Sequence, residues 1–167
     1  MAIKNCNSLS LHFLAAAAAF ILVAAGKGAD AVLPPRDLCK DTDYQPLCRS
    51  VLKGITSPEQ ATQAFINATI HETALAKDVV KRLGKSKELD TCHDSFVYAI
   101  SSLKNALRNL NEHDRLALNT NLNAAVTNYA ACDDVYAELG QISPFANNTK
   151  TLRHMTSNCI ALAILVD

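Results

Sequence analysis

Residues 89–139 read LDTCHDSFVYAISSLKNALRNLNEHDRLALNTNLNAAVTNYAACDDVYAEL, and they carry two apolar stripes. In each stripe the apolar positions advance in alternating steps of three and four residues, which is the spacing of the buried seam of a packed helix. The first stripe comprises Leu89, Cys92, Phe96, Ala99, Leu103, Ala106 and Leu110. The second comprises Leu118, Leu122, Ala125, Tyr129, Cys132, Tyr136 and Leu139. The stretch therefore predicts two long helices that turn near residues 111–113 and form an antiparallel hairpin.

The register of this hairpin is indicated by two of its cysteines. Cys92 and Cys132 lie on opposite stripes, at equal distances in sequence from residue 112. Going up one helix and down the other brings both residues to the same height. Because a disulfide requires the two Cα atoms to lie within about 7 Å of each other, this geometry predicts a bond between Cys92 and Cys132.

A further helical pattern lies on each side of the hairpin. The earlier helix starts with Ser57 as its N-cap and ends at Gly84, and the later one starts after Ser143 and Pro144. The earlier stripe comprises Ile66, Ile70, Thr73, Val80 and Leu83, and the later one Leu152, Met155, Cys159, Leu162 and Val166. The four helices predict an all-α fold, an up-and-down antiparallel four-helix bundle over residues 58–167.

Residues 1–31 have the features of a secretory signal peptide. Residues 11–25 are nearly all apolar, and Ala29-Asp30-Ala31 fits the small-x-small rule for cleavage, with cleavage after Ala25 as the alternative. The apolar run of 15 residues is shorter than the roughly 20 that span a bilayer, so we expect no membrane anchor after cleavage. Removal of residues 1–31 leaves 14 basic and 15 acidic residues, a balance that disfavours nucleic acid as a partner.

Five cysteines remain after cleavage. Because the secretory route is oxidising, we expect two disulfides and one free thiol. Cys39 and Cys48 flank a polar turn that precedes Pro46, which favours a small hairpin closed by a bond between these two cysteines. Cys159 lies on the apolar stripe of the last helix and is interpreted as a buried, unpaired thiol.

The sequence offers no motif for catalysis or for the binding of a metal or cofactor. His71-Glu72 begins like the HExxH motif of zinc proteases, but Leu75 occupies the position of the second histidine. The histidines that remain after cleavage are scattered among different helices and are interpreted as surface or turn residues. Trp is absent and aromatic residues make up 5% of the chain, which disfavours direct carbohydrate binding. We therefore expect no catalytic residue, no metal and no cofactor.

A long stretch of the hairpin carries no charge. Residues 116–132 contain no Asp, Glu, Lys or Arg, and amide and hydroxyl side chains occupy the positions off the apolar stripe. Such a surface is expected where a helix is desolvated against a partner, or where the helix is the central one of the bundle. The sequence weighs equally for these two interpretations. The expected interface residues are Asn119, Asn123, Thr127, Asn128 and Ala131, with help from the first bundle helix.

Two N-glycosylation sequons occur, at Asn67 and at Asn147. Asn67 lies within a predicted helix. Asn147 is expected in a loop, which makes it the better acceptor.

Four segments together resemble one known family. They are CKDTDYQPLC at 39–48, TCHDSFVYAISSL at 91–103, NLNAAVTNYAACDDVYAELG at 121–140 and SPFANNTKTLRHMTSNCIALAI at 143–164. The chain resembles the plant inhibitors of pectin methylesterase and of acid invertase. The resemblance implies a single inhibitor domain over residues 32–167, in which a helical hairpin at 32–57 precedes the bundle. It also implies disulfides Cys39–Cys48 and Cys92–Cys132, and a non-covalent 1:1 complex that covers the active-site cleft of the target enzyme.

The two branches of the family are separated by small differences. Invertase inhibitors often carry Pro-Lys-Phe after the second bundle helix, and residues 109–119 (NLNEHDRLALN) lack this tripeptide, which favours pectin methylesterase as the target. Many pectin methylesterase inhibitors have Thr where Ala131 stands, which weakens the same assignment. Inhibition of a cell-wall or vacuolar acid invertase is therefore the alternative. A secreted helical bundle without inhibitory activity is a more distant one.

The expected location follows from the target. An inhibitor of pectin methylesterase would act in the apoplast and cell wall, whereas an inhibitor of a vacuolar invertase would act in the vacuole. Short connections between the helices disfavour a cytokine-like bundle, and the lack of adjacent cysteines disfavours a lipid-transfer protein.

Overall fold

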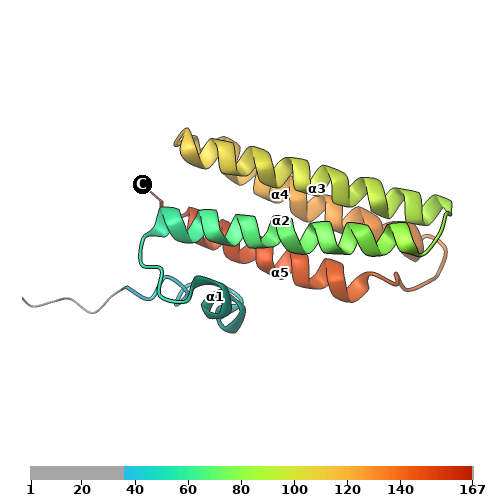
Figure 1. Cartoon of the computed structure of the whole chain (residues 1–167), viewed down its shortest axis with the longest axis horizontal. Coiled ribbons are helices and arrows are strands. Elements are labelled where there is room, and N and C mark those ends of the chain that lie inside the picture. Colours follow the sequence, from blue (N-terminus) through green and yellow to red (C-terminus); the bar gives the residue numbers. More distant parts are fainter. Residues whose placement is uncertain (1–35, 167) are drawn as a thin grey trace, which may run out of the picture. The chain divides into compact units, whose positions relative to one another are not determined.

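The computed structural model describes residues 36–166, and this part of the chain consists of five α-helices without β-strands (Figure 1). The helices are α1 (Gln45–Leu52), α2 (Pro58–Arg82), α3 (Lys87–Asn111), α4 (Arg115–Ala137) and α5 (Ala146–Ala163). The predicted signal peptide lies outside the described residues. None of the described helices is long and apolar enough to cross a membrane.

The long helices begin where the sequence provides a capping side chain. Ser57 accepts a hydrogen bond from the backbone N–H of Gln60 at 3.4 Å, and Ser86 accepts one from Leu89 at 3.2 Å. Asp114 starts α4 in the same way. Each cap satisfies one of the backbone donors that a helix leaves unpaired in its first turn.

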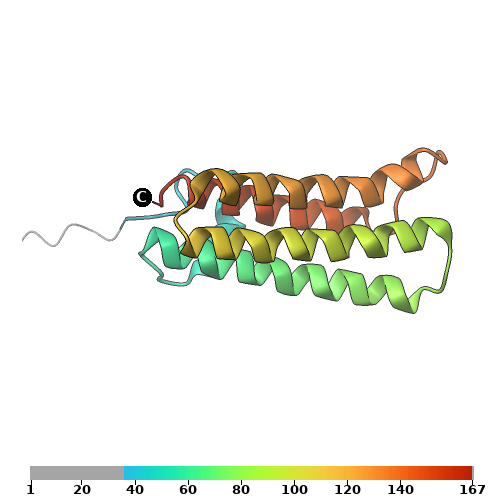
Figure 2. The ribbon, with the colours of Figure 1, turned by 90° about the horizontal axis from the view of Figure 1, so that it is seen from above.

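The four long helices form the predicted up-and-down antiparallel bundle (Figures 1 and 2). Each of them packs on two neighbours, in the cyclic order α2, α3, α4, α5. Helices α2 and α4 therefore stand at diagonal corners of the bundle. The first bundle helix, α2, was expected to contribute to the same interface as α4, but it does not adjoin α4, because α3 and α5 are the neighbours of α4.

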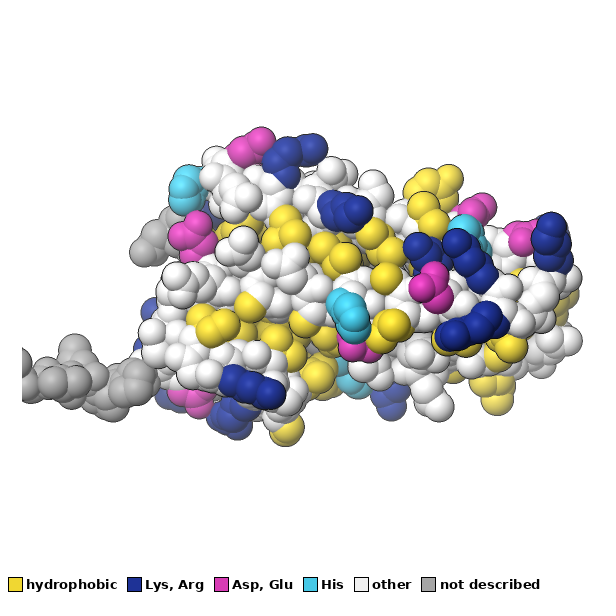
Figure 3. Space-filling view, viewed as in Figure 1, with side chains coloured by type: hydrophobic (Ala, Val, Ile, Leu, Met, Phe, Trp, Pro, Cys, Tyr) yellow, Lys and Arg dark blue, Asp and Glu magenta, His cyan; other side chains and the backbone are white. Residues whose placement is uncertain are grey.

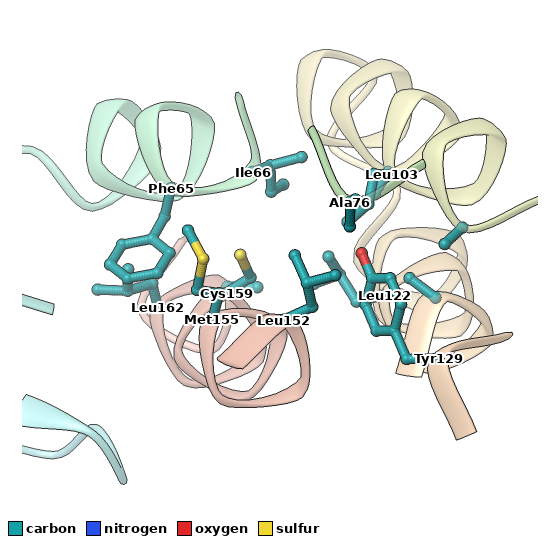
Figure 4. Close-up of a cluster of buried hydrophobic side chains, with 14 of the residues drawn as sticks. Phe65, Ile66, Ala76, Leu103, Leu122, Tyr129, Leu152, Met155, Cys159 and Leu162 are labelled. Carbon is teal, nitrogen blue, oxygen red and sulfur yellow. The ribbon is translucent and has the colours of Figure 1, made fainter. Parts of the chain in front are cut away.

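The core fills the space between the four helices (Figure 4). Phe65, Leu122 and Leu162 are fully buried in it, as is the ring of Tyr129. The Tyr129 hydroxyl reaches across the core to Thr73 on the diagonal helix α2, with 2.7 Å between the two oxygens. This bond satisfies a polar group that would otherwise be costly to bury.

Both expected disulfides are present. Cys92 and Cys132 join α3 to α4 with their Cα atoms 4.4 Å apart, and Cys39 is bonded to Cys48. The short Cα separation fits the small side chains at this seam, such as Ala99 and Ala125, which are fully buried.

The N-terminal hairpin has one α-helical arm, whereas two were expected. Residues 38–44 form hydrogen-bonded turns, and only the second arm is the helix α1. The physical reason is length, since only five residues, 40–44, lie between Cys39 and the start of α1. Hydrogen bonds from Cys39 N–H to Asp37 and from Thr42 to the Cys39 carbonyl hold the turns.

Two predicted stripes extend past the ends of their helices. Leu83 and Leu139 were expected in the core, but each has 55% of its surface exposed. Helix α2 ends at Arg82 and α4 at Ala137, ahead of Gly84 and Gly140, whose φ angles are +109° and +69°. Glycine adopts this left-handed conformation without steric cost, so the chain leaves the helix before the last apolar residue can turn inward.

Candidate partner-binding surface

The uncharged stretch of α4 presents one exposed strip. Its exposed residues are Leu116, Thr120, Asn123 and Thr127, which follow one another in steps of four, three and four. This spacing keeps them on one side of the helix. The opposite side packs into the core through Leu118, Leu122, Ala125 and Tyr129. Helix α4 is thus not shielded all round by its neighbours, and the strip faces solvent.

The five expected interface residues are spread across the outer half of α4. Asn123 and Thr127 lie on the exposed strip, whereas Asn119, Asn128 and Ala131 are half-buried at its edges. Asn128 is two turns from Asn121, whose side-chain N–H donates to Asn109 of α3 at 2.9 Å, so Asn128 lies on the edge towards α3. Asn119 is one turn from Arg115, which donates to the Ile164 carbonyl at the end of α5, so Asn119 lies on the edge towards α5.

The polar side chains of this surface are held against their own helix. Asn123 and Asn128 each donate a side-chain N–H to the backbone carbonyl four residues earlier, at 2.9 Å in both cases. The Thr127 hydroxyl does the same at 3.2 Å. These bonds fix the rotamers, so less side-chain entropy is lost when a partner covers the surface.

One polar atom near the surface is unpaired. The Asn119 Oδ1 atom is buried and has no hydrogen-bond partner among the described residues. An unsatisfied acceptor of this kind costs about 1–3 kcal/mol of stability.

Charged side chains border this strip: the exposed Asp134 follows Thr127 by seven residues on the same side of α4. Asp133 follows the uncharged stretch and turns to α5, where its Oδ2 atom accepts from the Thr149 hydroxyl at 2.7 Å and lies 3.5 Å from Arg153. Lys and Arg side chains gather instead where α2 ends and α3 begins (Figure 3). The exposed members of this basic group are Lys81, Arg82, Lys85 and Lys87.

Cys159 is fully buried in the core, where its sulfur lies 3.7 Å from the Thr69 hydroxyl, and it is the one cysteine of the described residues outside a disulfide. Burial raises the pKa of the Cys159 thiol to about 12. A thiol that stays protonated at neutral pH is a poor nucleophile, so the position supports a packing role.

One histidine takes a position that the sequence did not indicate. His154 of α5 stacks on Tyr44, with 3.7 Å between the ring centroids and 13° between the ring planes. Burial, followed by the nearby Lys150 and Arg153, lowers the pKa of His154. Among the described residues, no group of three or more His, Cys, Asp or Glu side chains could hold a metal ion.

The two sequons lie in helices. Asn67 is exposed within α2, as expected. Asn147 lies in the first turn of α5 and not in a loop, because the helix already begins at Ala146. The sequon threonines Thr69 and Thr149 are fully buried, so a glycan at either asparagine would have to be attached before the chain folds.

Comparisons with known proteins agree with this architecture. The family profile described as Plant invertase/pectin methylesterase inhibitor matches residues 35–162. The chain is similar to the crystal structure of mutant form A of a pectin methylesterase inhibitor from Arabidopsis, with a TM-score of 0.67, 18% sequence identity and coverage of 78% of this chain and 95% of that one. It is also similar to the crystal structure of a pectin methylesterase inhibitor from Arabidopsis thaliana, with a TM-score of 0.61, 17% identity and coverage of 77% and 93%. No curated protein sequence matches the chain. At this level of identity the two structures show a common fold.

Proposed function

Because the chain belongs to the plant invertase/pectin methylesterase inhibitor family, whose members are inhibitors and not enzymes, we propose that its target is a pectin methylesterase. It binds this enzyme non-covalently, one to one, and covers the active-site cleft. The target assignment rests on the region between α3 and α4. Residues 112–114 form a short turn there, without the Pro-Lys-Phe tripeptide that invertase inhibitors often carry.

The observation that carries the proposal is the exposed, uncharged strip of α4, which includes Asn123 and Thr127. Burying charged side chains without partners is costly, whereas amide and hydroxyl groups can be desolvated if the partner supplies hydrogen bonds. The Cys92–Cys132 disulfide holds this helix on α3. A rigid surface of this kind loses little conformational freedom on binding.

Acid invertase remains the second candidate target, on one specific observation. Ala131 stands where many pectin methylesterase inhibitors have Thr, and it is half-buried on the edge of α4 towards α3. Ala131→Thr adds a hydroxyl at this edge. If the chain inhibits invertase, the substitution weakens that inhibition; if it inhibits pectin methylesterase, the substitution preserves or strengthens it.

The test is a titration of the purified protein against pectin methylesterase and acid invertase, side by side. We expect loss of pectin methylesterase activity that saturates at one inhibitor per enzyme, and full recovery when the two proteins are separated. Inhibition of invertase alone would identify acid invertase as the target. Progressive loss of activity at a catalytic dose would show that the chain is an enzyme, and loss of neither activity would refute inhibition.

Secretion and processing belong to the same proposal. Residues 1–31 are removed as a signal peptide, and the inhibitor domain of residues 32–167 reaches the apoplast with glycans at Asn67 or Asn147. N-terminal sequencing of protein collected from culture medium should begin at Val32. A sequence that begins at Gly26 would place cleavage after Ala25, and retention of Met1 would contradict secretion by this route.

A further inference from the structure

We propose that Tyr98 of α3 is the aromatic anchor of the partner-binding surface, so that the target enzyme contacts the outer faces of α3 and α4 together. This inference rests on the proposed function. We call the surface formed by Tyr98 and Ser102 of α3 with Thr127, Asn128 and Ala131 of α4 the α3–α4 face.

Tyr98 is unusual among the exposed apolar residues of the described chain. Most of the others lie at helix ends or in loops, where they are hard to bury: Leu83, Leu116, Leu139, Ile142 and Ile164. Only Leu75, Val97 and Tyr98 lie in the middle of a helix, and Tyr98 is the one aromatic ring, with 61% of its surface exposed. A large amphipathic ring that projects into solvent from the middle of a helix can contact a partner with little loss of side-chain entropy.

Helix geometry places Tyr98 on the side of α3 that borders α4. Tyr98 lies eleven residues, or three turns, before Asn109, so the two side chains leave α3 on the same side. Asn109 accepts a hydrogen bond from Asn121 of α4, which identifies this side as the one next to α4. Figure 2 shows α3 and α4 running side by side along their length.

The height of Tyr98 along the bundle follows from the Cys92–Cys132 disulfide, which fixes the level of α3 relative to α4. The two helices run antiparallel, and each rises by about 1.5 Å per residue. Tyr98, six residues after Cys92, is therefore level with Val126, six residues before Cys132, and so with the turn of α4 that holds Thr127 and Asn128.

The two helices are also uncharged at the same height. Residues 95–103 of α3 contain no Asp, Glu, Lys or Arg, and residues 116–132 of α4 contain none. Through the register just described, the uncharged stretch of α3 lies beside the part of α4 that contains Asn123, Thr127 and Asn128. Apart from the exposed Asp94, one turn before Tyr98, the side chains around the ring are small and uncharged, which is the composition of a protein interface with its energetic centre at the aromatic ring.

The rest of the described chain leaves this face open. Helix α1 packs on α2 and α5 and does not contact α3 or α4. We assign this face to the target enzyme, because the chain belongs to a family of inhibitors that act by binding an enzyme. Its matching surface should be a pocket or shelf with apolar walls and few charges, because Tyr98 supplies a ring and the α4 residues of the α3–α4 face carry no charge.

The test compares Tyr98→Ala with Val97→Ala in the same titration against both enzymes. Val97 is the next residue and is 41% exposed, but it follows His93 by one turn, and His93 lines a hollow with Val80 and Lys81 of α2. Adjacent residues point about 100° apart on a helix, so Val97 faces α2 and serves as the control. We expect Tyr98→Ala to raise the inhibition constant at least tenfold and Val97→Ala to change it less than threefold, with both variants melting close to the wild type.

The outcomes separate the two proposals. If the wild type inhibits an enzyme and Tyr98→Ala inhibits it equally well, the anchor proposal is wrong and the proposed function stands. An equal loss in Val97→Ala would also refute it, because the contact would then not be specific to the α3–α4 face. If the wild type binds neither enzyme, both proposals fall. Tyr98→Phe keeps the ring, so its loss of affinity should be less than half of the loss in Tyr98→Ala. An equal loss of affinity in the two variants would refute the ring as the anchor, because the hydroxyl alone would then make the contact.

Discussion

The two sides of the bundle are stabilised in different ways. Helices α3 and α4 are joined by a disulfide and by the contact between the Phe96 and Tyr129 rings, and the described chain leaves their outer faces open. Helices α2 and α5 pack on each other without a disulfide, through side chains such as Phe65 and Met155, and α1 packs against them (Figures 1 and 4). The covalent bond gives the α3–α4 pair stability that its outer surface does not have to supply. That surface can therefore remain uncharged and exposed, which suits a contact with another protein.

The largest expected effect concerns the disulfides. Replacing Cys92 and Cys132 by Ala together opens a loop with a sequence separation of 40, for which chain-entropy models give about 3–4 kcal/mol of lost stability. The matched control replaces Cys39 and Cys48, whose separation is 9 and whose loss should cost about 2–3 kcal/mol. Urea unfolding of both double variants measures the difference. A larger loss of stability on removal of the Cys39–Cys48 disulfide would contradict the special role of the disulfide between α3 and α4.

The second largest effect is expected on binding of the target enzyme by the outer faces of α3 and α4. Thr127→Lys places an ammonium group on the exposed strip of α4, and an interface that desolvates it should bind more than tenfold, or about 2–4 kcal/mol, more weakly. Asn128→Lys should have a smaller effect, because Asn128 is half-buried at the edge and a long side chain there can reach solvent. Affinity and melting temperature are measured together. Unchanged affinity in Thr127→Lys would place the interface elsewhere, and a collapse of the melting temperature would show that the strip is needed for folding.

A smaller effect, on stability, is expected at the side of the bundle formed by α2 and α5, against which α1 packs. The buried Asn158 side chain accepts a hydrogen bond from the Tyr44 N–H at 3.1 Å and donates one to the Tyr44 carbonyl at 3.0 Å, which ties the N-terminal hairpin to α5. Asn158→Ala leaves the Tyr44 N–H unpaired, whereas the Tyr44 carbonyl still accepts from the Cys48 N–H at 2.9 Å, and the substitution should cost about 1–3 kcal/mol.

The readout is hydrogen exchange of the α1 amides together with the melting temperature. The control is Ser157→Ala, which removes a bond to Asp43 at the exposed edge and should cost less than 1 kcal/mol. Faster exchange throughout α3 and α4 in Asn158→Ala would contradict the independence of the two sides.

The smallest expected effect is a pH dependence of stability that arises from His154 of α5. Burial lowers the pKa of His154 below its unfolded value, so the unfolded state binds the proton more tightly. The contribution to stability is complete above the unfolded pKa of about 6.5 and is lost as the pH falls below it. Melting curves from pH 7.5 to 5 should therefore decline more in the wild type than in His154→Gln. Identical slopes would show that His154 does not contribute.

Most of the fold could be predicted from the sequence, because a helix bundle is encoded in local periodicity. The stripes of three and four residues placed α2 to α5, and the distance of Cys92 and Cys132 from residue 112 predicted their bond. The contacts of the N-terminal hairpin could not be predicted this way. Asn158 and Tyr44 are 114 residues apart, and a single buried amide leaves no periodic signal.

The candidate surface could be predicted only in part. The uncharged stretch 116–132 indicated α4 as a candidate surface, and one side of it is exposed, but Asn119 and Asn128 lie at the edges of that side because it is determined by the positions of α3 and α5. Tyr98 was missed because one aromatic residue off the apolar stripe can be buried at a seam or exposed. A signal for it did exist in the charge-free run of residues 95–103.

The threonines of the core have a consequence for how this family diverges. Thr62 is fully buried, and its hydroxyl donates to the carbonyl of Pro58, one turn earlier in its own helix. Such a bond needs no polar group on another helix, so an exchange between threonine and valine at this position requires no compensating change elsewhere. Thr69 and Thr73 make the same kind of bond but also contact other helices, at Cys159 and Tyr129 respectively. A core whose polar groups are mostly satisfied within one helix lets neighbouring positions mutate independently, which is consistent with a shared fold at 17–18% identity.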